Sequence, residues 1–347
     1  MASPIVENQS EPPKPSRMPA WRWVVAIALA AVLLYKALHG VDWFQVWRTV
    51  VSARWDYLAA AACISVGSFV LRALRWRILL NAGAAVPLRA GAVFRANMAG
   101  YLGNNILPAR AGEVIRSLIV SSQSSLSRAY VLTTAVSERM TDAIVLVLWG
   151  SLTLALGRVA KPAWMEGVAR TMALGAAAGA LALMVLPHAE RLVQHIVGWL
   201  PLPPALKSRL RAMVQQILLA IRAFHHVGRF LNFALLTAAI WCADTTGLIV
   251  SARGLGLRLP ISAAVLLLTA MGLGSALPST PGYVGIYQFA AVTVLAAFGI
   301  GRDQALAYSL VTQAVGYVVI AVLGVPGLYG SVAHGKAKTA NRPQLQV

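Results

Sequence analysis

The stretch N-M-A-G-Y-L-G-N-N-I-L-P-A-R-A-G-E-V-I-R, residues 97–116, decides how this chain folds. It lies in a strongly apolar sequence, yet it holds two adjacent Asn, a Pro, three Gly and the charged residues Arg110, Glu113 and Arg116. Gly103 and Pro108 weaken regular helix, and lipid offers no partner for the backbone groups that such a break releases. We therefore predict a broken, re-entrant segment. The alternative is a short polar loop between two ordinary spans.

Composition assigns the chain to membrane proteins. Of its 347 residues, 58% are hydrophobic and only 12% are charged, against about 25% charged in soluble proteins. The formal net charge of +19 fits cytoplasmic loops that face an anionic inner-leaflet surface. Clustered Lys/Arg with interleaved aromatics is absent from the sequence, so we expect no nucleic-acid partner. Cys63 and Cys242 lie in apolar runs, and we expect buried packing residues and no metal site.

The apolar runs predict an all-α polytopic protein with about six full spans and two broken segments. The spans are expected near 22–38, 57–74, 130–152, 168–187, 230–251 and 304–327, and the broken regions at 92–125 and 261–300. The transmembrane domain would cover 21–330 and include a basic amphipathic linker at 188–228. A disordered tail at 1–20 and a basic tail at 331–347 would flank it.

Lys/Arg residues predict the orientation of the chain. With the N terminus inside, the cytoplasmic segments 1–22, 72–95, 188–229 and 334–347 carry 3, 5, 6 and 3 Lys/Arg, 17 in all, against eight outside. The positive-inside rule then places both termini in the cytoplasm.

The second broken region repeats the first. Leu102–Glu113 and Leu273–Tyr283 both contain Leu-Gly, then Leu-Pro, then a Gly four residues after that Pro. The repeat halves, about 57–156 and 230–328, would enter the membrane from opposite sides. Inverted repeats of this kind place substrate sites between paired broken helices, whereas a chance similarity of Gly/Pro-rich loops is the alternative. The motif residues are Asn104, Asn105, Pro108, Gly112, Pro278, Pro281, Gly282 and Tyr283.

Charged residues inside the predicted membrane region mark a candidate site. The span 130–152 holds Glu138, Arg139 and Asp142, and a lone charge at mid-membrane costs about 2.5–3.5 kcal/mol on insertion scales. Arg110, Glu113 and Arg116 are the expected partners. The arginines would attract an anionic headgroup, while the acids orient them, bind a cationic headgroup or carry protons. The alternative is an ion-pair network that only joins the two halves.

Weaker candidates lie elsewhere. Asp244, the only acid of the second half at membrane depth, either carries a proton or bonds a neighbour's Ser/Thr. Tyr287 and Gln288 either line the outer half of a polar path or bond helix to helix. Arg72, Arg75 and Arg77 end the second span, where we expect them to snorkel to lipid phosphate.

Four motifs together resemble the flippase-like family, the transmembrane domain of lysylphosphatidylglycerol synthase and its stand-alone relatives. They are R-A-L-R-W-R-I-L-L (72–80), N-N-I-L-P-A-R-A-G-E-V-I-R (104–116), S-E-R-M-T-D (137–142) and L-P-S-T-P-G-Y-V-G-I-Y-Q (277–288). The resemblance implies a bacterial inner-membrane protein that moves a lipid between leaflets. Gln313 departs from the Arg that such proteins often carry there. The soluble aminoacyl-transfer domain of full-length synthases is not found in this sequence.

The leading hypothesis is a transporter of an anionic, aminoacylated or polyprenyl-linked lipid, with membrane lipids as partners and no cofactor. The sequence has no P-loop for direct use of ATP. An enzyme acting on lipid-linked substrates is the first alternative, with Glu113, Glu138 and Asp142 as acid/base or metal ligands. A non-transporting scaffold for a lipid-modifying partner is the second.

Overall fold

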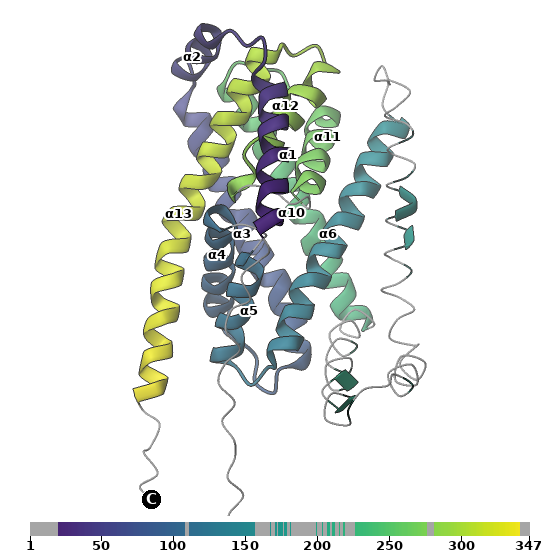
Figure 1. Ribbon diagram of the computed structural model, residues 1–347, viewed down its shortest axis with the longest axis vertical. Coiled ribbons are helices and arrows are strands. Elements are labelled where there is room, and N and C mark those ends of the chain that lie inside the picture. Colours follow the sequence, from purple (N-terminus) through teal and green to yellow (C-terminus); the bar gives the residue numbers. More distant parts are fainter. Residues whose placement is uncertain are drawn as a thin grey trace, which may run out of the picture.

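The computed structural model describes residues 20–107, 111–156, 226–275 and 281–340, together with isolated positions between 167 and 218. Every described element is helical (Figure 1). The elements are α1 (Ala20–Leu38), α2 (Trp43–Val51), α3 (Trp55–Gly83), α4 (Ala90–Ile106), α5 (Ala111–Gln123), α6 (Arg128–Leu156), α10 (Val227–Gly254), α11 (Ile261–Gly274), the 3₁₀ turn η2 (Pro281–Tyr283), α12 (Ile286–Ala296) and α13 (Arg302–Ala340).

Both predicted broken regions are helical hairpins. The first pairs α4 with α5, and the second pairs α11 with α12. These four helices have 17, 13, 14 and 11 residues, which correspond to about 16–26 Å at 1.5 Å per residue. The hydrocarbon core is about 30 Å thick, so each of these helices is too short to cross it alone. This is the geometry of a re-entrant segment.

The two halves of the chain are arranged as an inverted repeat. The α4–α5 hairpin lies in the lower half of Figure 1, and the α11–α12 hairpin lies in the upper half. Helices α3 and α6 flank the first, and α10 and α13 flank the second. Each hairpin also packs against a flanking helix of the other half. Helix α4 packs on α13, and α11 packs on α6. The predicted repeat is therefore present in the packing as well as in the sequence.

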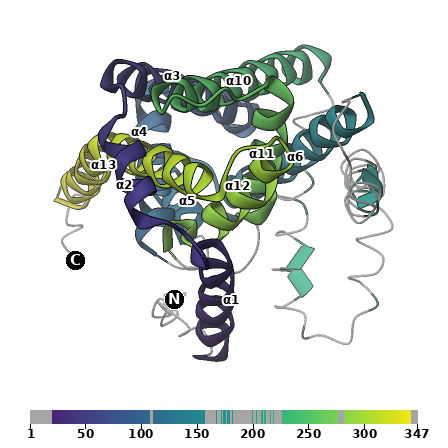
Figure 2. The ribbon, with the colours of Figure 1, turned by 90° about the horizontal axis from the view of Figure 1, so that it is seen from above.

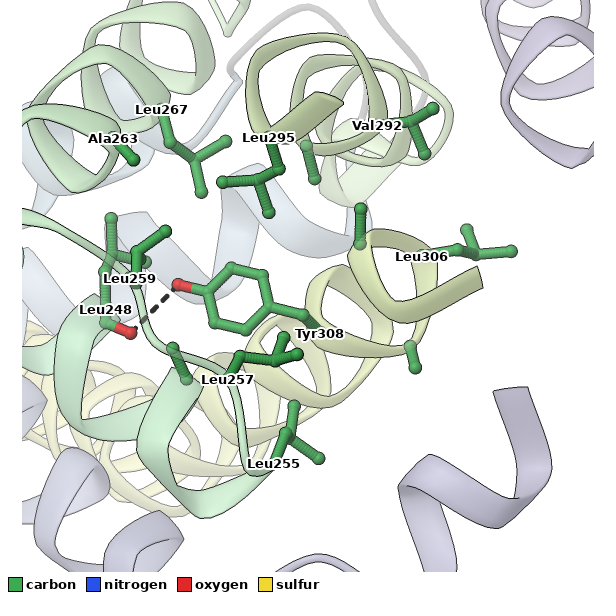
Figure 3. Packing of buried hydrophobic residues seen from close by; sticks show 14 of the residues in the cluster. Leu248, Leu255, Leu257, Leu259, Ala263, Leu267, Val292, Leu295, Leu306 and Tyr308 are labelled. Carbon is green, nitrogen blue, oxygen red and sulfur yellow. Dashed lines mark hydrogen bonds between the residues drawn. The ribbon is translucent and has the colours of Figure 1, made fainter. Parts of the chain in front are cut away.

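A pair of buried tyrosines occupies matching places in the two halves. Tyr130, near the start of α6, donates its hydroxyl to the carbonyl oxygen of Leu79 in α3 at 2.8 Å. Tyr308, near the start of α13, donates to the carbonyl oxygen of Leu248 in α10 at 3.0 Å (Figure 3). Each tyrosine belongs to an apolar cluster at one end of the molecule. The two clusters fix the flanking helices on which the hairpins rest.

Glycines allow the helices of the first hairpin to touch. A Cβ added to Gly112 would lie 1.8 Å from the carbonyl oxygen of Gly100. The Gly112 backbone N–H donates to Asn104 Oδ1 at 2.9 Å. Helix α4 continues through Gly103 and ends at Ile106, so the break in the segment comes after Gly103. A Cβ on Gly103 would come within 3.0 Å of the Gly112 Cα, which shows that this glycine serves close packing.

Three described helices are long and apolar enough to cross a membrane, namely α3, α10 and the part of α13 from Arg302 to Tyr329. Helix α6 has 29 residues but carries the charged cluster, so the total of six spans stays a prediction. The expected span 168–187 and the linker 188–228 lie almost entirely outside the described residues. The described residues also leave out the tail 1–19, residues 341–347, Pro108, Arg110 and Pro278.

Cys63 and Cys242 are exposed, so the expectation of buried packing residues was wrong. The outer surface of a membrane protein is itself apolar where it faces lipid tails, and an apolar run therefore does not imply burial.

Substituting Gly112→Ala should prevent normal folding, because its methyl group overlaps the Gly100 carbonyl. Gly67→Ala on α3 is the matched control, since no atom lies within 4 Å of its added Cβ. Size-exclusion chromatography of detergent extracts should show a loss of monodisperse protein for Gly112→Ala alone. Equal profiles for the two variants would contradict the close packing of α4 and α5.

The inverted topology predicts opposite labelling of two loops. Val86 in the α3–α4 loop and Arg258 in the α10–α11 loop are both exposed. Each would be replaced by Cys in a background without Cys63 and Cys242. An impermeant maleimide should label position 258 in intact cells and position 86 only after permeabilisation. Labelling of both from one side would refute the topology, and a reversed pattern would refute the predicted orientation.

Candidate functional site

A cavity of about 370 Å³ lies between the two halves of the repeat. In Figure 2, α3 and α10 run side by side and face the layer that contains both hairpins, α6 and α13. Residues from all of these helices line the cavity. Its charged lining residues are Arg72, Glu113, Arg139, Asp142 and Asp244.

Arg75 forms the centre of the ion-pair network behind the cavity. Its side chain is fully buried, and its guanidinium lies 2.8 Å from Glu138 Oε1 and 2.6 Å from Asp142 Oδ1. It also donates to Thr237 Oγ1 of α10 at 3.1 Å. One guanidinium thus joins α3 to α6 and to α10.

Glu138 links this centre to the first hairpin. While its Oε1 accepts from Arg75, its Oε2 accepts from Arg116 of α5 at 3.0 Å. Arg116 also donates to Asn97 Oδ1 of α4 at 2.7 Å and to Glu113 Oε2 at 2.6 Å. A buried charge is tolerated only where it is paired and hydrogen-bonded, and Glu138 meets that condition through two arginines.

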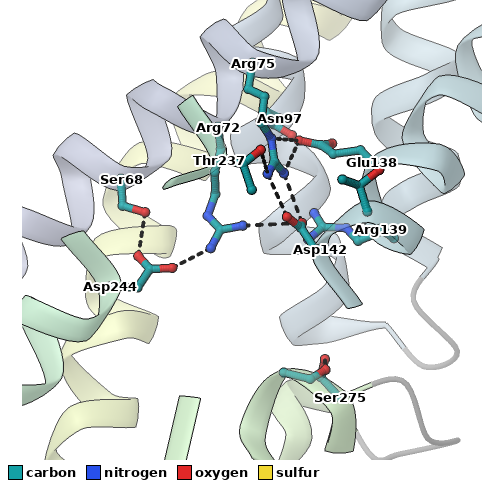
Figure 4. A network of polar contacts seen from close by, with 12 residues as sticks. Ser68, Arg72, Arg75, Asn97, Glu138, Arg139, Asp142, Thr237, Asp244 and Ser275 are labelled. Carbon is teal, nitrogen blue, oxygen red and sulfur yellow. Dashed lines mark hydrogen bonds and ion pairs between the residues drawn. The ribbon is translucent and has the colours of Figure 1, made fainter. Parts of the chain in front are cut away.

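The outer part of the network faces the cavity (Figure 4). Arg139 is 24% exposed; it lies 3.0 Å from Glu113 Oε1 and 3.6 Å from Asp142 Oδ2. Arg72 joins the same network, because it lies 3.8 Å from Asp142 Oδ2 and 2.5 Å from Asp244 Oδ2. These groups are the ones that a ligand in the cavity can reach.

Each of the four clustered arginines also lies over an aromatic ring, at 4.4–5.5 Å from the ring centroid. The pairs are Arg72 with Trp241, Arg75 with Phe233, Arg116 with Trp76, and Arg139 with Tyr101. A cation is attracted by the face of such a ring, more strongly where water is excluded. Four arginines and four carboxylates, those of Glu113, Glu138, Asp142 and Asp244, balance in charge.

The structure brings together five of the six sequence-predicted headgroup residues, and Arg110 lies outside the described residues. Arg116 and Glu138 are sealed, with side chains at most 2% exposed. Glu113, Arg139 and Asp142 line the cavity. The role of all five in binding a headgroup stays a prediction.

The expectation of snorkelling to lipid phosphate was wrong for Arg72 and Arg75, and it stays a prediction for Arg77. Helix α3 runs on to Gly83, Arg72 and Arg75 are buried among acids, and Arg77 Nε donates to the carbonyl oxygen of Leu88 at 2.6 Å. The apolar sequence that continues after Arg77 was the available signal. It shows that the arginines lie within the helix and not at its end.

Asp244 accepts a hydrogen bond from Ser68 Oγ at 2.5 Å, which confirms the predicted bond to a neighbour's Ser. Its pairing with Arg72 was not predicted, because its partner lies 172 residues earlier in the chain. Together the two bonds join α3 and α10 beside the cavity.

Uncharged groups hold the second hairpin. Gln288 Nε2 donates to Gln313 Oε1, and Gln313 Nε2 donates to the carbonyl oxygen of Gly282 at 2.7 Å. The Tyr317 hydroxyl donates to the same Gly282 carbonyl. Gln313 thus occupies the place of the Arg that the family resemblance implies, and it fixes the turn by neutral bonds.

The remaining motif residues divide between the two hairpins. The side chain of Asn104 accepts a hydrogen bond from the Gly112 N–H at the start of α5. Both Asn104 and Asn105 line the cavity. The turn Pro281–Tyr283 is a 3₁₀ element, and the ring of Tyr283 stacks on that of Tyr287 at 5.3 Å. Within the described ranges, no group of three or more His, Cys, Asp or Glu is placed to hold a metal ion.

The sequence is similar to those of known membrane proteins. The sequence model of the lysylphosphatidylglycerol synthase TM region matches residues 23–324. A UPF0104 membrane protein of Methanothermobacter thermautotrophicus is 23% identical, over 86% of this chain and 90% of the relative. Glycosyltransferase AglD of Haloferax volcanii is 24% identical over 87% of this chain. The match covers 52% of AglD, so this chain corresponds to about half of that protein's length.

Substituting Glu138→Gln should destabilise the fold strongly, because Arg75 and Arg116 would lose a shared counter-charge in a sealed site. Breaking a buried pair costs about 3–5 kcal/mol. Thermal unfolding of the purified protein in detergent measures the effect.

Asp56→Asn provides the matched control for Glu138→Gln. It breaks the Arg54–Asp56 pair, in which both side chains are 63% exposed, and such pairs contribute about 0–1 kcal/mol. Similar melting temperatures for the two variants would show that the buried network does not hold the helices together.

Proposed function

The chain belongs to the lysylphosphatidylglycerol synthase transmembrane family, and from this premise we propose that it moves a lipid headgroup between the two leaflets. The observation that carries the proposal is a cavity with charged and polar side chains in its wall, to which both oppositely inserted hairpins contribute. Paired broken helices around a central site are the arrangement by which many transporters alternate access. Each hairpin would close one end of the path.

The cavity suits the phosphate of an anionic, aminoacylated or polyprenyl-linked lipid. Guanidinium groups bind phosphate oxygens in a bidentate manner, and Arg139 and Arg72 are the two arginines that line the cavity. Phosphate would replace Glu113 as the partner of Arg139, and Glu113 would keep its contact with Arg116. The exchange therefore leaves no buried carboxylate without a cation.

The driving force would be the lipid gradient or protons. Asp244 and Glu113 are the carboxylates of the cavity wall with the most exposed side chains, at 20% and 14%, so they are the ones that a proton can reach. The proposal places the protein in the bacterial cytoplasmic membrane with both termini inside. A lipid-modifying protein is a candidate partner that would supply or consume the lipid.

A second candidate is an enzyme that acts on a lipid-linked substrate, which the name of the glycosyltransferase relative favours. Against it, Glu138 and Asp142 are each held by arginines in the described structure. Formation of a new lipid species by the purified protein would favour this candidate over transport.

Transport should depend on Arg139. Proteoliposomes would contain phosphatidylglycerol with a nitrobenzoxadiazole label, which external dithionite reduces only in the outer leaflet. The rate at which inner-leaflet label becomes reducible should fall about tenfold or more in Arg139→Gln, since a charge-assisted bond to phosphate is lost. Arg48→Gln on the exposed face of α2 should keep the native rate. Equal rates for Arg139→Gln and native protein at matched reconstitution would remove the basis for the proposal.

A further inference from the structure

The polar lining of the cavity is divided into two regions of different chemistry. Among the described residues, its charged side chains come from α3, α5, α6 and α10. The polar side chains contributed by the second hairpin and α13 are uncharged. They are Ser275, Tyr283, Tyr287, Thr312, Gln313 and Tyr317. We call this second set the neutral region.

The neutral region contains a flat aromatic surface. The rings of Tyr283 and Tyr287 stack at a 5.3 Å centroid distance with 14° between their planes. Tyr283 has a φ of 62°, and for a non-glycine residue this costs of the order of 1–3 kcal/mol. Such strain persists where the surrounding structure imposes it, and it is concentrated at ligand-binding sites. The strained turn holds the Tyr283 ring at the cavity wall.

Hydrogen-bonding groups surround this surface. Gln313 and Tyr317 fix the turn through the Gly282 carbonyl. In the charged region, where Arg72 lies over its ring, the lining residue Trp241 has a buried indole N–H with no hydrogen-bond partner among the described residues. A buried donor without a partner is costly, and an oxygen atom of a bound ligand would satisfy it.

We propose that the neutral region binds an uncharged polyhydroxylated group, a sugar or polyol, whose attached lipid phosphate lies against Arg139 and Arg72. This inference rests on the proposed transport function and names the headgroup that the same cavity would take. Hydroxyl groups both donate and accept hydrogen bonds, as do the amide and hydroxyl side chains of the neutral region. The aromatic surface would pack against the apolar face of the ring.

A quaternary ammonium headgroup fits the observations less well. Aromatic sites for such cations enclose the charge with several ring faces, whereas Tyr283 and Tyr287 lie parallel to each other. The cavity's carboxylates come from the opposite helices, where arginines already pair with them.

The test measures the apparent Kd of three lipids by native mass spectrometry of the full chain. Phosphatidylinositol carries phosphate and a polyol ring, phosphatidic acid carries phosphate alone, and phosphatidylcholine carries a quaternary ammonium. Tyr287→Leu removes the aromatic surface, and Tyr287→Phe keeps the ring without its hydroxyl. Tyr329→Leu, on an exposed position of α13, is the control.

Tyr287→Leu should weaken phosphatidylinositol binding about tenfold, which corresponds to about 1.4 kcal/mol. Phosphatidic acid binding should be unchanged, Tyr287→Phe should retain most of the phosphatidylinositol affinity, and Tyr329→Leu should match the native protein. Equal loss for phosphatidylinositol and phosphatidic acid, or a loss confined to phosphatidylcholine, would overturn the inference.

Arg139→Gln separates this inference from the proposed function. If Arg139→Gln weakens both anionic lipids while Tyr287→Leu weakens neither, the phosphate site stands and the polyol site is refuted. If Arg139→Gln changes the affinity for no lipid, the phosphate site fails, and the polyol site attached to it fails as well.

Discussion

The carboxylate that Glu138 shares between Arg75 and Arg116 is the interaction on which the rest of the structure depends. An unpaired charge at membrane depth is costly, and Glu138 avoids that cost by pairing with both arginines, which pair in addition with Asp142 and Glu113. Glu138, Arg75 and Arg116 come from α6, α3 and α5, so their pairing fixes the first hairpin against two long helices. The same residues pair with Glu113 and Asp142, which line the cavity.

The two repeats share a backbone arrangement but differ in chemistry. The first hairpin is held by ion pairs, and the second by neutral bonds through Gln288 and Gln313. Neutral hydrogen bonds are weaker than charge-assisted ones, so polar bonds contribute less to holding the second hairpin, which also packs in an apolar cluster. The same difference gives the cavity a charged region and a neutral one, and a headgroup with a phosphate and an uncharged part would contact both.

The sequence predicts the two hairpins and their inverted order, because a Gly/Pro break at membrane depth must be enclosed by protein or line a water-filled cavity. It also predicts the cluster of Glu113, Arg116 and Glu138. It does not reveal the burial of Arg75, because three arginines within six residues look like the end of a span until their partners on α6 and α10 are placed. It does not reveal the packing role of Gly103 either, because only the crossing of α4 and α5 shows that this glycine allows a close contact.

The central claim is that the cavity between the hairpins opens to each side of the membrane in turn. Ser65, which lines the cavity from α3, allows a direct measurement as Ser65→Cys in a background without Cys63 and Cys242. In oriented proteoliposomes, the account predicts that impermeant thiol reagents modify this cysteine from either side, and more slowly when an anionic lipid is added. Modification from only one side, in protein that remains folded, would contradict it.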